Sequence, residues 1–318
     1  MSGWDQLSWF EIAPELVKPA LAACRGFNTV LDVAFYDVPS LERDLRDLGK
    51  GVVTAGANAP PSALDLDALV NPEGALLVVD PARAPYVTRF EDLQSYLDWH
   101  DAAEARPKAC SITGVGSSAL GSAALAWNVA KALGQPVIAI VPGYGVADAV
   151  EQALGGWFGF GLHEALGTKS ALQTWLADYA PELAWVGRKL VASTPGHGKT
   201  ATGAPTFLRG SGSSDVLHAL MLKIEITCLV GHSKGALQIG NALDGLEAAR
   251  TENLRVVTLG CPIAETAAGA TYRQYLGVFD ALGQLNAWGN QPSCWTPTQH
   301  TTNRQLPLAM DAVALVAA

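Results

Sequence analysis

Residues 226–237 read Ile226-Thr227-Cys228-Leu229-Val230-Gly231-His232-Ser233-Lys234-Gly235-Ala236-Leu237. An apolar run enters the pattern Gly-x-Ser-x-Gly, and small residues at helical spacing leave it. In this context of strand, tight turn and helix, the pattern places a serine on a strained turn with its hydroxyl clear of the sheet. Gly231 and Gly235 lack a Cβ, so strand and helix can close around the turn. The stretch therefore predicts a nucleophilic Ser233 at the N-terminal end of a helix.

The segments around this stretch continue the alternation of strand and helix. The predicted elements are strands at 108–113, 136–141 and 255–259 and a helix at 119–133. Such alternation favours an α/β fold with a mostly parallel sheet flanked by helices. Ligands of these sheets bind at the carboxyl ends of the strands. The turns at 114–118, 142–145 and 260–262 are therefore expected to gather there with Ser233.

The remaining segments give weaker predictions. They are strands at 28–36, 74–80 and 274–279, helices at 40–48, 89–103, 170–179 and 306–318, and loops at 56–61 and 193–214. Residues 107–149 and 214–318 form the predicted α/β core. Residues 1–106 carry no chemical motif, and we expect them to pack on one edge of the sheet or to form a small subdomain.

Residues 150–213 interrupt the alternation and are expected to form an inserted cap over the site, since so long a connection is rarely structureless. They carry Trp157, Phe158 and Phe160 among four glycines. These rings, with Tyr144 near the mouth, would offer apolar area to an acyl chain. The alternatives are a surface excursion in place of a cap, and aromatic rings that only pack the insertion onto the sheet.

The composition excludes several classes of protein. Of 318 residues, 49% are hydrophobic and 16% charged, which is enough for a sizeable core. A net charge of −9, with no gathering of Lys and Arg, argues against a nucleic-acid partner. Five scattered cysteines without a Cys-x-x-Cys pair favour neither a metal site nor a disulfide framework. The first residues lack a basic n-region and an apolar run, which predicts a cytoplasmic location.

Three further motifs accompany the Ser233 turn, in order along the chain. They are Thr113-Gly114-Val115-Gly116-Ser117-Ser118-Ala119, Val137-Ile138-Ala139-Ile140-Val141-Pro142-Gly143-Tyr144-Gly145 and Val256-Val257-Thr258-Leu259-Gly260-Cys261-Pro262. With them, the chain from about residue 108 onward resembles the α/β-hydrolase superfamily in its lipase and esterase branch. The first motif is similar to the His-Gly-x-Gly oxyanion turn, with Thr113 in place of histidine. The resemblance implies an α/β-hydrolase fold and hydrolysis of carboxylic esters without a metal or organic cofactor.

A serine hydroxyl needs a histidine to accept its proton and a carboxylate to orient that histidine. In this superfamily the residues follow the order Ser, acid, His. Of six histidines, only His300 follows Ser233 by enough chain, and His232 is expected to point away from its neighbour serine. Asp280 ends a predicted strand and is the preferred acid, with Glu265 as the alternative. The expected oxyanion donors are the backbone N–H groups of Lys234 and Val115.

Two rival motifs remain. Gly114-Val115-Gly116-Ser117-Ser118-Ala119 also fits the dinucleotide pattern Gly-x-Gly-x-x-Ala, which would indicate a nucleotide-dependent oxidoreductase. That pattern needs an acid after the next strand, where none stands. Residues 193–200 differ by one residue from a phosphate-binding loop, but the sequence after them cannot begin a stable helix.

A hydrolase fold that only binds is a third alternative. The expected partner is a small-molecule or lipid-like ester. Contact with a membrane or lipid interface is compatible with this sequence, and the oligomeric state is left open.

Overall fold

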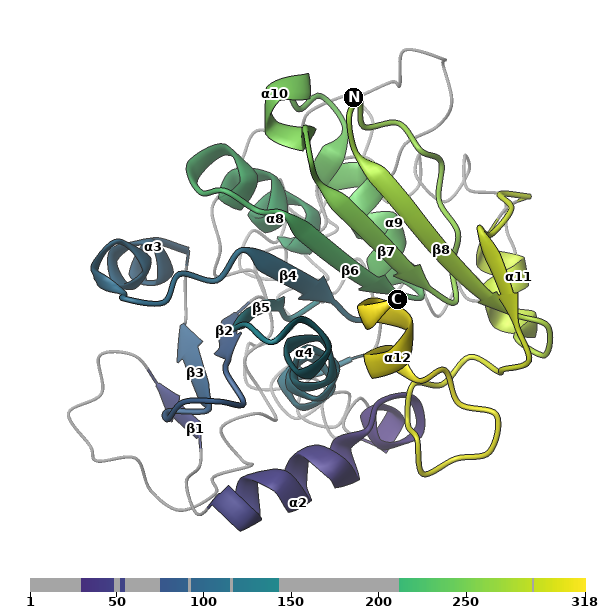
Figure 1. Ribbon diagram of the computed structural model, residues 1–318, viewed down its shortest axis with the longest axis horizontal. Coiled ribbons are helices and arrows are strands. Elements are labelled where there is room, and N and C mark those ends of the chain that lie inside the picture. The colour runs from purple at the N-terminus through teal and green to yellow at the C-terminus, as the bar shows by residue number, and fades with distance from the viewer. Residues whose placement is uncertain are drawn as a thin grey trace, which may run out of the picture.

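The computed structural model describes residues 30–48, 52–54, 75–90, 93–114, 117–142, 212–287 and 289–318. The strands in these ranges are β1 (Val52–Thr54), β2 (Leu76–Val79), β3 (Val87–Phe90), β4 (Ala109–Ile112), β5 (Val137–Ile140), β6 (Cys228–His232), β7 (Arg255–Leu259), β8 (Thr271–Gly277) and β9 (Cys294–Thr296). They form one nine-stranded sheet of order β1-β3-β2-β5-β4-β6-β7-β8-β9 (Figure 1). Among these strands, β2 pairs antiparallel with both neighbours and every other pairing is parallel. The sheet is therefore mostly parallel, as predicted.

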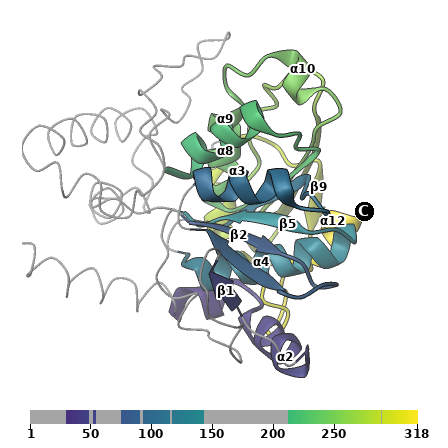
Figure 2. The same cartoon turned by 90° about the vertical axis from the view of Figure 1, so that its left-hand side faces the viewer.

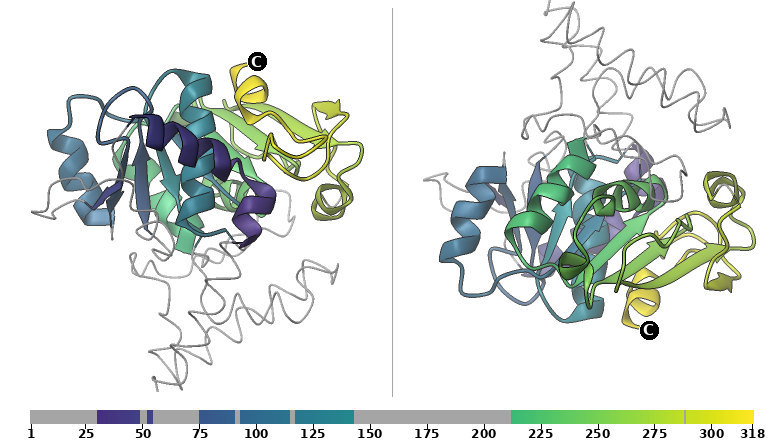
Figure 3. Two further views of the ribbon diagram at one scale, coloured as in Figure 1. Left: turned by 90° about the horizontal axis from the view of Figure 1, so that it is seen from below. Right: turned by 90° about the horizontal axis from the view of Figure 1, so that it is seen from above.

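Helices cover both faces of this sheet. The described helices with assigned bounds are α2 (Val38–Leu48), α3 (Leu93–Ala102), α4 (Ala119–Leu133), α8 (Gly212–Lys223), α9 (Lys234–Leu243), α10 (Ala248–Thr251), α11 (Ala281–Asn286) and α12 (Ala312–Ala317). In Figure 2, α3, α8 and α9 lie above the sheet, and α4 and α2 lie below it; α12 packs on the same face as α4. Figure 3 shows the two faces in turn, with α2 and α4 toward the viewer from below and α8 and α9 from above. The result is a three-layer α/β architecture.

Two apolar cores separate these layers. Side chains along a strand point alternately to opposite faces. In β5, Val137 and Ala139 accordingly belong to the core beneath α4 and α12, whereas Ile138 and Ile140 belong to the core beneath α8 and α9. All four side chains are fully buried. Burial on both faces explains why this strand reads as a continuous apolar run.

The predictions for the central elements agree closely with the structure. The predicted bounds of α4 and β7 match it residue for residue, and β4 and β5 begin and end within one residue of their predicted ends. The α4 helix begins with Ser118 as its N-cap and ends at Gly134 in the left-handed conformation. These local signals explain the agreement, because each end of α4 is specified by the residue that caps it.

The prediction of a strand at 28–36 is wrong for the described part of it, since residues 30–35 are helical. Asp32 and Tyr36 are buried, and Leu31 and Phe35 are partly buried, whereas Val30 and Val33 face solvent. Inward positions at i, i+1, i+4 and i+5 fit a helix and not a strand. The β-branched residues that favoured a strand lie on the exposed side.

Other predicted bounds also need correction. The helix predicted at 89–103 begins only with α3, because Arg89 and Phe90 still belong to β3. The helix predicted at 306–318 is limited to α12, because Leu308 has a φ of +58° and Asp311 caps the helix start with its side chain. The loop predicted at 193–214 overlaps the start of α8 at Gly212. No strand is predicted from the sequence at β1, β3 or β9.

Several predictions lie outside the described residues. They include the loop at 56–61, the helix at 170–179, and the pocket residues Tyr144, Trp157, Phe158 and Phe160, together with the oxyanion candidate Val115. Within the ranges that the structure describes, β1, β2 and β3 extend the sheet from the region 1–106. In those ranges, no helix combines the length and the hydropathy that crossing a lipid bilayer would require.

Candidate active site

Ser233 stands between β6 and α9 in a strained backbone conformation, with a φ of 55° and a ψ of −133°. A positive φ is uncommon for a residue with a Cβ and is concentrated at functional sites. Close packing enforces this turn. A Cβ at Gly231 would lie 2.6 Å from the Cα of Ala236, and one at Gly235 would lie 2.3 Å from the carbonyl oxygen of Ile112. Both glycines of the motif are therefore required by backbone contacts.

The structure brings together the three side chains predicted for a triad. His300 Nε2 lies 2.8 Å from Ser233 Oγ. On the other side of the ring, Nδ1 lies 2.8 Å from each carboxylate oxygen of Asp280. An ionised carboxylate only accepts hydrogen bonds, so Nδ1 carries the proton and Nε2 accepts from the serine hydroxyl. This arrangement can remove a proton from Ser233 and stabilise the resulting imidazolium.

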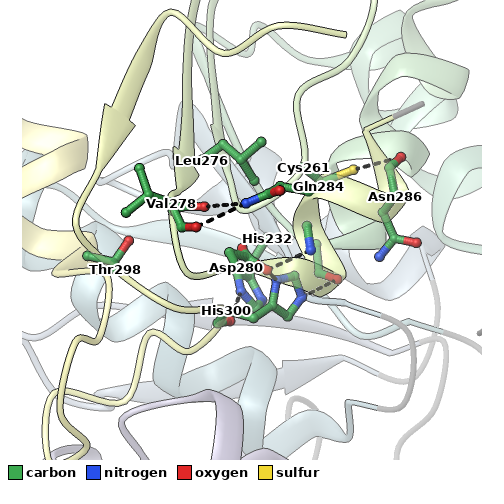
Figure 4. A network of polar contacts seen from close by, with 12 residues as sticks. His232, Cys261, Leu276, Val278, Asp280, Gln284, Asn286, Thr298 and His300 are labelled. Atoms are coloured by element: carbon green, nitrogen blue, oxygen red, sulfur yellow. Dashed lines mark hydrogen bonds and ion pairs between the residues drawn. The ribbon is translucent and has the colours of Figure 1, made fainter. Parts of the chain in front are cut away.

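The loop after β8 positions the carboxylate. Asp280 is 1% exposed and caps α11, with its Oδ1 accepting from the N–H of Gly283 at 2.6 Å. Gln284 donates from its side-chain amide to the carbonyl oxygens of Gly277 and Val278, which holds the same loop (Figure 4). Gly260, which directly follows β7, packs against the side chains of Asp280 and His300. A Cβ there would lie 3.0 Å from Asp280 Oδ2 and 3.1 Å from His300 Nδ1.

The alternative acid lies elsewhere. Glu265 accepts from the side-chain amide of Gln274 at 3.0 Å. Asp244 and Glu247 occupy the cap positions of α9 and α10. Of these four carboxylates, Asp280 is the one hydrogen-bonded to His300. The choice between Asp280 and Glu265 as the partner of His300 is settled geometrically in favour of Asp280.

Residues 30–37 also build the site, although the sequence carried no recognised motif there. Their backbone carbonyls are bound by the residues that follow His300. Thr301 Oγ1 donates to the carbonyl oxygen of Ala34 at 2.8 Å, and the N–H of Thr302 donates to that of Phe35 at 2.8 Å. Asn303 and Arg304 add bonds to the carbonyl of Val33 and the carboxylate of Asp37, respectively. The segment thus holds the loop that carries His300.

The same segment reaches the glycine-rich turn before α4. Asp32 accepts from the backbone N–H of Ser118 at 3.0 Å and from its hydroxyl at 2.5 Å. Burial raises the pKa of Asp32 to about 6, although these hydrogen bonds oppose the shift. A Cβ at Gly121 would lie 2.2 Å from Asp32 Oδ1, so only glycine fits the first turn of α4 here. A carboxylate therefore already occupies the N-terminal end of this helix.

A cavity opens beside Ser233, with a volume of about 470 Å³ that includes open space at its mouth. Its described lining combines apolar and polar side chains: Leu31, Asp32, Phe35, Tyr36, Gly114, Ser117, His232, Ser233, Lys234, Leu282, Asn286 and His300. Leu31, Asp32, Phe35 and Tyr36 were missed by sequence reasoning. The helical spacing of these four residues was the available signal, and it was misread as a strand.

Lys234 begins α9 directly after Ser233. Its backbone N–H therefore belongs to the first turn of the helix, where N–H groups favour a developing negative charge.

The described residues contain no cluster of His, Cys, Asp and Glu suited to a metal ion. Comparisons of the chain with family models, curated proteins and solved structures find no match. The function is therefore inferred from the geometry of the site itself.

Proposed function

We propose that this chain is a serine hydrolase of the α/β-hydrolase type that cleaves carboxylic esters. The observation that carries the proposal is the continuous chain from Ser233 Oγ through the ring of His300 to Asp280, with 2.8 Å at each step. Its serine stands on a strained turn between a parallel strand and a helix, and the three residues follow the order Ser, Asp, His along the chain.

In the first half-reaction, Ser233 Oγ attacks the acyl carbon of the ester while His300 Nε2 takes the hydroxyl proton. Asp280 stabilises the imidazolium through the Nδ1–H bond. The carbonyl oxygen becomes an oxyanion, and the proposed donor to it is the backbone N–H of Lys234 in the first turn of α9. Losing one such donor typically costs about 3 kcal/mol of barrier. Collapse of this intermediate breaks the ester C–O bond, and His300 returns the proton to the departing alkoxide.

In the second half-reaction, water replaces the alcohol. His300 takes a proton from the water as its oxygen attacks the acyl-serine, and a second tetrahedral intermediate forms. Its collapse releases the carboxylic acid and restores the Ser233 hydroxyl with the proton from His300. Leu31, Phe35 and Leu282 contribute an apolar wall to the cavity, which supports binding of an acyl group there.

The oxidoreductase alternative has weaker support. A dinucleotide would place its pyrophosphate at the N-terminus of α4, the helix that follows the glycine-rich turn. There the buried carboxylate of Asp32 already binds the N–H and hydroxyl of Ser118. A second anion at this position would face like-charge repulsion. A role in binding without catalysis has no observation in its favour, because the aligned triad serves proton transfer.

Labelling with a fluorophosphonate and turnover of p-nitrophenyl esters of graded chain length test the proposal. The wild-type protein should be labelled on Ser233 and hydrolyse at least one ester. Ser233→Ala should abolish both, and His300→Ala should be nearly as damaging, because a triad acts as a unit. Ser293→Ala is the control: this exposed serine accepts from the backbone N–H of Gln274 and contacts no member of the proposed triad, so labelling and turnover should stay as in wild type. Retained turnover in a clean Ser233→Ala preparation would show that the assignment is wrong.

A further inference from the structure

A second buried histidine lies beside the base. His232 directly precedes Ser233, is 1% exposed, and has its ring centroid 4.9 Å from that of His300. Its Nδ1 lies 3.0 Å from the hydroxyl oxygen of Tyr36. Its Nε2 lies 2.9 Å from the backbone carbonyl oxygen of His300. The proposed reaction uses none of these contacts directly, so they need an explanation of their own.

The partners determine where the protons lie. A backbone carbonyl only accepts, so His232 Nε2 carries the proton and donates to His300. Nδ1 must then accept, and the hydroxyl of Tyr36 donates to it. The hydroxyl oxygen of Tyr36 accepts in turn from the N–H of Gly114 at 2.7 Å. Every donor in this chain has an acceptor, which selects one tautomer of His232.

The chain of bonds links three parts of the site that come from distant positions in the sequence. Gly114 is the first residue of the glycine-rich turn that follows β4. A Cβ at Gly114 would lie 3.0 Å from the Cβ of Ser233. His232 belongs to the turn that carries Ser233, and the carbonyl of His300 belongs to the loop after β9. Tyr36 is 3% exposed and packs edge-on against the ring of His232, with centroids 5.2 Å apart. Such satisfied buried networks rigidify what they connect.

We propose that Tyr36 and His232 are positioning residues, which hold the backbone of His300 and the turn at Gly114 at fixed distances from Ser233. This inference rests on the proposed hydrolase function. It assigns neither residue a role in proton transfer to substrate. Their role is to keep His300 Nε2 within reach of Ser233 Oγ, because a displacement of about 1 Å can cost a factor of 100 in rate.

Substitutions at Tyr36 and His232 can remove the hydrogen bonds of this network one at a time. Tyr36→Phe removes the hydroxyl and keeps the ring. His232→Gln places an amide near the position of Nε2 and keeps the donor to His300, whereas His232→Asn keeps only a partner for Tyr36. We expect Tyr36→Phe and His232→Asn to lower kcat by about 10- to 100-fold, with KM within about twofold of wild type. His232→Gln should retain more of kcat than His232→Asn.

The control is Tyr96→Phe. Tyr96 is also a fully buried tyrosine, but within the described chain its hydroxyl has no hydrogen-bond partner. Its removal should leave kcat and KM unchanged. In the double variant Tyr36→Phe/His232→Gln, kcat should fall little beyond the loss of Tyr36→Phe alone, since both changes break the same bond. Losses that multiply, or Tyr36→Phe turnover equal to wild type, would overturn the inference.

Two measurements keep this test separate from that of the function. Labelling of wild-type Ser233 is established first. If it fails, the hydrolase proposal fails; if it succeeds and Tyr36→Phe turns over normally, only the positioning role fails. Should the variants not fold, ¹⁵N spectra of the wild-type imidazoles decide the matter. We expect His232 as the neutral Nε2–H tautomer at neutral pH, and the Nδ1–H tautomer would contradict the network.

Discussion

The backbone N–H of Ser233 donates to the carbonyl oxygen of Leu259 at 2.9 Å, which ties the nucleophile to the end of the neighbouring strand. The next residue, Gly260, has a φ of +71° and packs against both Asp280 and His300. One strand end thus touches every member of the triad. The geometry of the three side chains depends on the backbone between Leu259 and Gly260 as much as on their own bonds.

We therefore expect Gly260→Ala to damage catalysis as well as stability. The methyl group would crowd the Asp280–His300 pair, and the positive φ would add strain of roughly 1 kcal/mol. Gly134→Ala is the matched control, because Gly134 also has a positive φ, of 62°, but its Cβ would meet nothing within 4 Å. Urea unfolding should show a loss of stability for both variants, larger for Gly260→Ala because of the added crowding, while kcat should fall only for Gly260→Ala. Normal kcat in Gly260→Ala would contradict this account.

The second prediction concerns the acid. Asp280→Asn should lower kcat by about 10⁴-fold, because an amide can impose the wrong tautomer on His300. Glu265→Gln should keep wild-type turnover, since Glu265 bonds Gln274 and not the base. Steady-state kinetics on one ester, with circular dichroism to verify folding, measures both. A crippled Glu265→Gln beside an active Asp280→Asn would reverse the assignment.

The third prediction follows from Asp32. Its folded pKa of about 6 lies above the usual 3.8. Between pH 3.8 and about pH 6, Asp32 keeps a proton in the folded state that it has already lost in the unfolded chain. The stability that Asp32 contributes to the wild-type protein therefore falls as the pH rises from 4 to 6. Asp32→Asn removes the titration. The unfolding free energy of Asp32→Asn minus that of wild type should therefore rise by about 2 kcal/mol between pH 4 and pH 7.

Urea unfolding at several pH values measures this difference. His232, whose pKa burial lowers to about 3, titrates in both proteins and cancels in the subtraction. A difference that stays constant with pH would mean that Asp32 is not held in its raised-pKa environment.

The fourth prediction tests the link between the segment 30–37 and the base loop. Arg304 donates to the buried carboxylate of Asp37 at 2.8 Å. Arg304→Gln should cost about 2 kcal/mol of stability, because it removes a charged hydrogen bond and leaves a buried anion poorly paired. Arg83 pairs with Glu104 on the surface, with both side chains largely exposed. Arg83→Gln should cost less than about 0.5 kcal/mol. Equal effects in thermal unfolding would contradict the prediction.

The elements predicted well from the sequence are those that local residues specify. The turn at Ser233 requires glycine at 231 and 235, because a Cβ at either position would clash with backbone atoms. Both glycines are part of the Gly-x-Ser-x-Gly motif, so the sequence predicts the turn directly. Asp280 was predicted from its place at the end of a strand, and its contact with His300 follows from the parallel order of the sheet. Both inferences needed only short-range pattern and strand direction.

The segment 30–37 could not be predicted in the same way. Its helix is specified by partners at Thr301 and Thr302, each 267 positions away in the chain. Propensity alone favoured a strand for its β-branched residues, and tertiary contacts override such a preference. The role of His232 was missed for the same reason, because Tyr36 lies 196 positions before it.

The hydrogen bonds between residues 33–35 and 301–303 also affect the order in which parts of the chain fold. Contacts across 267 positions carry a loop-closure cost and form slowly compared with local structure. A chain still being synthesised can form the turn at Ser233 long before the loop of His300 has left the ribosome. Ser233 then has no His300 beside it, so the proposed hydrolytic activity would begin only when residues 33–35 and 301–303 have met.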